Sequence, residues 1–220
     1  MATITRSALR STIRQRADME DSQFISDSEL NGYIQSSAAE LYDLLVESNE
    51  DYNTLDKLVT ISSGNSFSLP QNCYKVRGLD YTTDGGATFI PVWPFNFLER
   101  GAQFDPTLSR RIAQVRYKIM AGKIILLPES EAPGQYRLWW VPTLDPLVTD
   151  QAKLEGYNGF EEYVVLDCTI KCLNKEESDV SAHERALTKM KKRIENMSKS
   201  RDQGGPEVVA DVRDPWRDLW

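Results

Sequence analysis

The stretch "SDSELNGYIQSSAAELYDLLVESNEDYNTLDKLVTISS", residues 26–63, contains the change of periodicity that decides the fold. In its first half, apolar residues recur every three or four positions, which predicts an amphipathic helix. From Leu55 onward, apolar and β-branched residues alternate with polar ones, as is typical of a strand. The chain therefore passes from helical to β structure near residue 55.

The helical half of this stretch begins at a capping signature. Ser26 and Glu29 have the spacing at which the serine accepts from the third helical amide while the glutamate reaches back. We expect a helix of about 22 residues behind them, roughly 33 Å long at 1.5 Å per residue. A shorter amphipathic helix is predicted before it, over Thr5–Ala17.

Seven short runs rich in β-branched and aromatic residues follow Leu55, separated by turn residues, and they predict strands. Glycines at Asp84–Gly86 and Ala121–Gly122 suit hairpin turns, which need a positive φ. We therefore expect an antiparallel β domain, with one short helix inside it at Pro94–Gly101.

Helical periodicity returns after residue 150, with apolar stripes at 160–173 and 186–197. Because the link between these stripes is short, the two helices should pack antiparallel. The predicted fold is α+β: a four-helix core formed by 1–54 and 150–202, an inserted antiparallel β domain over 55–149, and an extended C-terminal arm over 203–220.

Composition narrows the classes of function. A formal net charge of -7 argues against a general nucleic-acid binder, whose domain would be basic. No run of 18 apolar residues predicts a membrane span, and the first residues do not resemble a signal peptide. Three dispersed cysteines favour reduced thiols in a cytoplasm over a disulfide framework.

The sequence offers no recognisable catalytic set. His183 is the single histidine and lies in a charged stretch, which argues against a nucleophile–histidine triad. No phosphate-binding loop or dinucleotide fingerprint occurs, and Cys168 and Cys172 lack the further ligands that a zinc site needs. Paired carboxylates are common but unspecific in so acidic a chain. We expect no enzyme activity, no cofactor and no metal.

Two patterns favour contact with partners. The predicted helix 185–201 carries a basic face that includes Lys189, Lys192 and Arg193, which is either a solvated face or a surface for an acidic partner or DNA phosphates. Adjacent Trp139 and Trp140 must point to opposite faces of their strand. Either at least one of them leaves the core of its own sheet, or both are buried within the β domain.

The chain ends in "DVRDPWRDLW", where apolar residues alternate with charges at an otherwise polar terminus. Burying one tryptophan contributes roughly 4 to 6 kcal/mol gross. This composition favours a docking arm over a tail that folds back on its own chain. The residues expected to bind the partner are Arg213, Pro215, Trp216, Arg217, Leu219 and Trp220.

The N-terminal segments "RQRADMEDSQFISDSEL" and "YIQSSAAELYDLLV" resemble the start of head-to-tail adaptor proteins of tailed bacteriophages, also called head-tail connectors. The likeness is specific over about a fifth of the chain and extends more loosely to "DPWRDLW". It implies a core of packed helices and assembly as a ring, dodecameric, beneath the portal protein. It also implies a C-terminal arm that docks onto the portal and a tail or nozzle protein on the other side.

The resemblance therefore predicts a structural virion protein of the neck, assembled in the host cytoplasm, whose ring lines the channel and lets DNA pass during ejection. Contact with passing double-stranded DNA would be non-specific, and no membrane partner is expected. The alternative is a tail-accessory hydrolase that degrades peptidoglycan, because some podovirus relatives are reported to do so. No motif in this chain supplies catalytic residues for that alternative.

Overall fold

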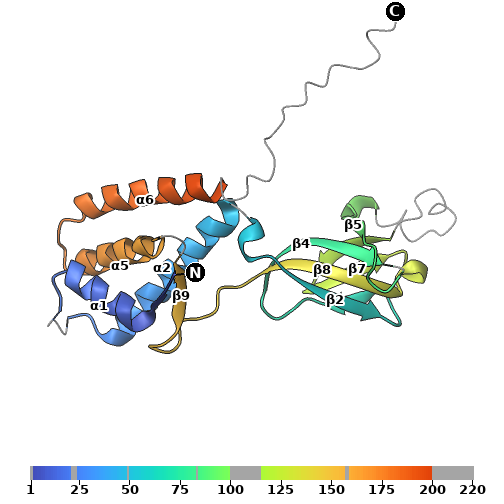
Figure 1. Ribbon diagram of the computed structural model, residues 1–220, viewed down its shortest axis with the longest axis horizontal. Helices are drawn as coiled ribbons and strands as arrows, with labels where there is room; N and C mark the ends of the chain where they lie inside the picture. Colours follow the sequence, from blue (N-terminus) through green and yellow to red (C-terminus); the bar gives the residue numbers. More distant parts are fainter. Residues whose placement is uncertain are drawn as a thin grey trace, which may run out of the picture. The chain divides into compact units, whose positions relative to one another are not determined.

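The computed structural model describes residues 2–20, 24–48, 50–82, 84–99, 115–156 and 159–199. The chain divides into two compact units, which we call the helical unit (Met1–Asn49 with Leu147–Trp220) and the β unit (Glu50–Pro146). Figure 1 shows the elements of both. Each unit is described by itself below.

Within the described residues, the helical unit contains four helices and two short strands. They are β1 (Ala2–Thr5), α1 (Arg6–Arg16), α2 (Asp27–Ser48), β9 (Lys153–Gly156), α5 (Glu161–Lys175) and α6 (Ser181–Lys199). Both predicted N-terminal helices are confirmed. Thr5 caps α1 by accepting from the amide of Ala8, and the Ser26 hydroxyl accepts from the Glu29 amide at 3.2 Å. The Glu29 carboxylate bonds to Lys175 and Tyr33.

The two strands were not expected from the sequence. β1 pairs antiparallel with β9 from the far end of the chain, with Ile4 opposite Leu154. Each strand has only four residues, so neither shows a convincing alternation by itself. This ribbon brings the N-terminus beside the segment that leads into α5.

Helix α5 is the centre of the helical unit and contacts α1, α2 and α6. Its residues Tyr163–Ile170 are all buried, so it is covered on every side instead of along one stripe. Burial on every side is what a helix surrounded by three others requires. The other helices keep one exposed face each.

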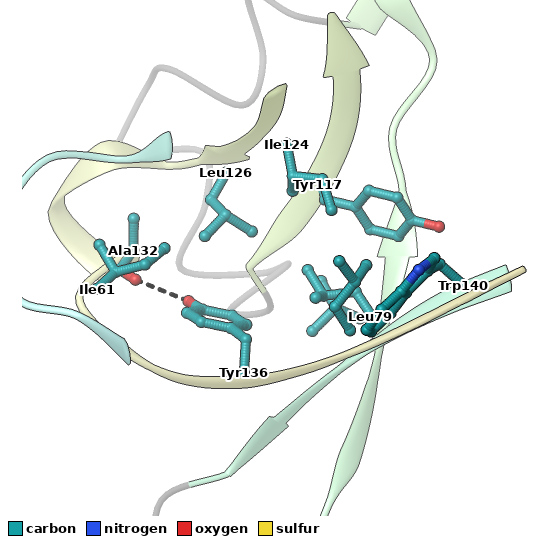
Figure 2. Packing of buried hydrophobic residues seen from close by; sticks show 10 residues of the cluster. Ile61, Leu79, Tyr117, Ile124, Leu126, Ala132, Tyr136 and Trp140 are labelled. Carbon is teal, nitrogen blue, oxygen red and sulfur yellow. Dashed lines mark hydrogen bonds between the residues drawn. The ribbon is translucent and has the colours of Figure 1, made fainter. Parts of the chain in front are cut away.

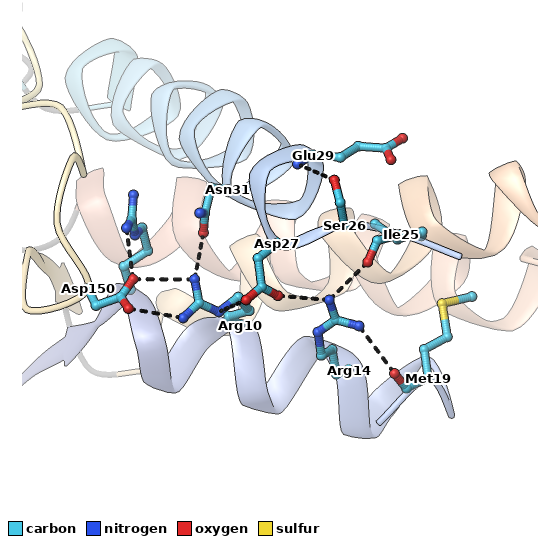
Figure 3. Close-up of polar contacts among 10 residues, drawn as sticks. Arg10, Arg14, Met19, Ile25, Ser26, Asp27, Glu29, Asn31 and Asp150 are labelled. Carbon is cyan, nitrogen blue, oxygen red and sulfur yellow. Dashed lines mark hydrogen bonds and ion pairs between the residues drawn. The ribbon is translucent and has the colours of Figure 1, made fainter. Parts of the chain in front are cut away.

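Three arginines, spaced four residues apart on α1, clamp this helix to the segments around it (Figure 3). Arg6 and Arg10 share the carboxylate of Asp150, at 2.7 and 3.2 Å, and these hydrogen bonds hold the pKa of Asp150 below its usual value. Arg14 binds the Asp27 carboxylate at 2.8 Å and the carbonyl of Ile25 at 2.9 Å. The clamp therefore joins α1 to the start of α2 and to the chain that returns from the β unit.

Among its described residues, the β unit contains one sheet of seven strands. They are β2 (Leu55–Ile61), β3 (Ser66–Ser68), β4 (Cys73–Thr82), β5 (Ile90–Pro94), β6 (Arg116–Met120), β7 (Lys123–Leu127) and β8 (Gly134–Pro142). The spatial order is β2-β8-β4-β5-β6-β7-β3, and the sheet curls into a nearly closed barrel. All seven predicted strand segments are present. The described part of this unit also has three 3-10 turns: η1 (Glu50–Asn53), η2 (Phe97–Glu99) and η3 (Glu129–Glu131).

The predicted fold class, a four-helix core with an inserted antiparallel β domain, is wrong. The seven-stranded sheet dominates the fold, and it is mixed because β5 pairs parallel with β6, Trp93 lying opposite Arg116. A parallel pair needs a crossover of a dozen or more residues, and the long connection between Pro94 and Arg116 supplies one. Sequence periodicity identifies strands but not the direction in which they pair.

The two predicted hairpin turns of the β unit are present, but the predicted short helix is not found in the described residues. Gly85, Gly86 and Gly122 have positive φ, as the two predicted hairpin turns require. In the segment Pro94–Gly101, by contrast, the described part forms only the three-residue turn η2 instead of a helix.

The core of the β unit lies inside the curled sheet (Figure 2). Tyr136 is fully buried, and its hydroxyl donates to the carbonyl of Ala132 at 2.8 Å. Leu79, Leu138 and Trp140 pack in the same cluster. Trp140 is buried while its neighbour Trp139 is only partly buried, which confirms that one of the two tryptophans leaves the core.

Candidate functional site

Helix α6 presents the predicted basic face. Lys189, Lys192 and Arg193 occupy positions i, i+3 and i+4, so they lie on one side of the helix, and all three are exposed. On its other side, Met190 and Ile194 are buried against the rest of the helical unit. The structure therefore brings the three predicted residues together, and their positive charge faces outward.

Aromatic rings of α5 and its N-terminal end lie near two cations of α6, of which only Arg193 belongs to this face. The guanidinium of Arg193 is 5.8 Å from the ring centroid of Phe160, and Lys191 is 6.0 Å from that of Tyr163. These distances fall within the range of cation–π attraction. Arg193 is thus drawn back toward α5, so Lys189 and Lys192 are the freer cations for a partner.

The predicted docking residues Arg213, Pro215, Trp216, Arg217, Leu219 and Trp220 lie outside the described residues. The structure therefore does not relate them to the α6 face.

A polar cluster between α2 and α5 was not predicted from the sequence. The Ser37 hydroxyl donates to the Asp167 carboxylate at 2.5 Å, and the Lys171 ammonium lies 2.6 Å from the same oxygen. Lys171 also reaches the Ser37 hydroxyl at 3.0 Å and the Glu40 carboxylate at 3.4 Å. Ser37 and Asp167 each lie in the apolar stripe of their helix, and they are 130 positions apart. The sequence pattern therefore gave no sign that they bond to each other.

The spacing of Ser37 and Lys171 is that of a nucleophile and its base. Ser37 is fully buried, however, so no substrate reaches its hydroxyl. Burial alone would lower the pKa of Lys171, but the hydrogen bond and charge of Asp167, with Glu40, raise it above its ordinary value. A lysine that keeps its proton at neutral pH cannot act as a base, so this geometry stabilises the packing of α2 on α5.

The thiols of Cys168 and Cys172 are buried as well. Burial raises the pKa of the Cys168 thiol to about 12 and that of Cys172 to about 11, so both stay protonated and weakly nucleophilic. Among the residues that the structure describes, no three His, Cys, Asp or Glu side chains are grouped to hold a metal ion.

Exposed apolar side chains are a second feature that the sequence only partly indicated. Several belong to β5, to η2 directly after it, and to the adjacent β6. This β5–β6 surface consists of Ile90, Trp93, Phe97, Leu98 and Ile119. Trp93 is 61% exposed and Leu98 is 83% exposed. The aromatic run "PVWPFNF" was the available signal, but alternation alone did not tell which of its rings face outward.

The described helices include none that combines the length and the apolar character needed to cross a membrane. Compared with known proteins, the chain matches no protein-family model and no curated protein.

Proposed function

We propose that this protein is a structural head-to-tail adaptor of a tailed bacteriophage, forming a ring between the portal and the tail. The observation that carries the proposal is the β5–β6 surface, whose large apolar side chains are exposed in the single chain. Monomeric proteins rarely leave large apolar areas in water, and several exposed apolar side chains on neighbouring elements favour contacts with other proteins. Neighbouring subunits of a ring would cover them.

The resemblance of the N-terminal segments supports the same assignment, and it supplies the partners: the portal on one side and a tail or nozzle protein on the other. In this proposal the ring is dodecameric and lies in the neck of the virion. The arm at 203–220 docks onto the portal and becomes ordered there, with its tryptophans as anchors and its charges as a polar rim.

Deleting residues 207–220 should abolish stable association with portal particles of the same virus, because the arm supplies the apolar anchors. Co-sedimentation and negative-stain microscopy measure the association. The matched control is the double substitution Asp211→Asn/Asp214→Asn, which keeps the length and the tryptophans. Binding by the truncated chain that equals binding by the full chain would contradict the docking role of the arm.

Helix α6 is proposed to face the DNA channel in the ring. Reversing Lys189 and Lys192 to glutamate should lower the retention of double-stranded DNA by assembled rings, and the difference should shrink as salt rises. Lys57→Glu/Lys123→Glu, exposed in the β unit, makes the same change in net charge and serves as the control. Equal losses in both double variants would place the effect in net charge instead of in α6.

A further inference from the structure

An open pocket of about 460 Å³ lies on the outer face of the β unit, where β4 pairs with β8. Among the described residues, five line it: Asp51, Thr54, Arg77, Gly78 and Trp139. Its volume is in the range of small-molecule sites in proteins. None of these residues belongs to the β5–β6 surface, to α6 or to the arm, so the proposed adaptor function does not use them.

One wall of the pocket is the indole of Trp139, which is held in place. Strand alternation turns Trp140 into the core and Trp139 outward. The Nε1 of Trp139 donates to Asp80 at 2.6 Å, and the Arg137 guanidinium lies 5.7 Å from the indole ring. The indole is therefore oriented before any ligand arrives, which lowers the ordering cost of binding.

The neighbour of Trp139 on β4 leaves room beside the ring. Gly78 is the register partner of Trp139, and a Cβ built on Gly78 would meet no heavy atom within 4 Å. Any other residue at this position would place a side chain next to the indole. Glycine within a strand lacks packing contacts and often marks a close approach by another molecule.

The polar rim of the pocket is balanced in charge. Arg77 binds Asp51 at 2.7 Å, and Thr54 adds a hydroxyl. A phosphate or nucleic-acid ligand would need an excess of positive charge, which this rim lacks. An apolar peptide anchor would need several apolar walls, and the indole is the only large apolar side chain among the lining residues that the structure describes. The rim instead offers charged and hydroxyl groups for hydrogen bonds beside one flat ring.

We infer that this pocket binds a saccharide, with one sugar ring lying against Trp139 and its hydroxyls bonded to Asp51, Arg77 and Thr54. A sugar ring has C–H groups that suit the negative face of an aromatic ring. Its neighbouring hydroxyls suit carboxylate and guanidinium groups, which form the stronger hydrogen bonds of proteins.

Titration of the full chain with maltotriose, cellotriose and triacetylchitotriose tests this inference. Tryptophan fluorescence and saturation-transfer NMR should both report saturable binding of at least one trisaccharide. Gly78→Val should weaken that binding by roughly tenfold or more, because its side chain occupies the space beside the indole. Thr54→Val, which removes the hydroxyl at similar volume, should weaken it less.

Gly32→Ala is the matched control, because a Cβ there also meets no heavy atom within 4 Å but Gly32 lies on α2. Its affinity should equal that of the wild type. The inference is overturned if no trisaccharide binds, or if folded Gly78→Val binds as the wild type does. It is also overturned if a peptide of residues 207–220, but no trisaccharide, binds and Gly78→Val abolishes that binding. The isolated chain suffices, so failure of ring assembly does not affect this test.

Discussion

Replacing Tyr136 by alanine should lower the free energy of unfolding of the β unit by about 3 to 5 kcal/mol, the usual cost of truncating a buried aromatic ring. Tyr136 is fully buried, and truncation also removes the hydroxyl that bonds to the carbonyl of Ala132. Urea unfolding followed by tryptophan fluorescence measures the effect, because the described tryptophans, Trp93, Trp139 and Trp140, all lie in the β unit.

Trp93→Ala provides the contrast. Trp93 is 61% exposed, so its truncation should change the stability of the chain by no more than about 0.5 kcal/mol. In the adaptor proposal it should instead impair ring assembly, which mass photometry measures. A large loss of stability in Trp93→Ala, with assembly intact, would mean that the β5–β6 surface serves the fold of the single chain.

Replacing Lys171 by methionine should destabilise the helical unit by about 3 kcal/mol, because it leaves the Asp167 carboxylate buried without its cation. This value is at the low end of the range for broken buried pairs, since the Lys171 side chain is 27% exposed and that of Asp167 is 12% exposed. Circular dichroism at 222 nm, which follows the helices, measures the loss during denaturation.

Lys175→Met is the matched control, one turn further along α5. Lys175 pairs with Glu29 at 2.7 Å in a more exposed setting, so its loss should cost only about 0 to 1 kcal/mol.

The pKa of Lys171 is raised in the folded state, so its stabilising effect holds below its unfolded pKa. That effect should be lost as pH rises through the folded pKa. Equal losses of unfolding free energy in Lys171→Met and Lys175→Met would contradict the stabilising role of the buried Ser37–Asp167–Lys171 cluster.

The sequence predicted the helices and strands better than it predicted which of them pair with one another. The capping residue Ser26 and the apolar spacing behind it located α2, because helix signals are local. The parallel pairing of β5 with β6 depends on the path of a long connection, so the periodicity of either strand does not reveal it. That is why all seven strands of the β unit were expected although the predicted architecture was wrong.

The candidate sites show the same division between local and distant information. Lys189, Lys192 and Arg193 could be placed on one helical face from their spacing alone. The bond between Ser37 and Asp167 joins residues 130 positions apart, and that proximity arises only when α2 packs on α5. The pocket beside Trp139 likewise needs the register that places Gly78 opposite it, and two shifts of register between β4 and β8 set that pairing.

The arginine clamp on α1 also has a consequence for the order of events during synthesis. Arg6 and Arg10 bind the carboxylate of Asp150, and α5 follows Asp150 in the chain. The ribosome therefore makes the entire β unit before α1 and α2 can acquire their central helix. The β unit is contiguous in sequence and has its own core, so it can fold as soon as it emerges. The helical unit, though it begins first, is completed last.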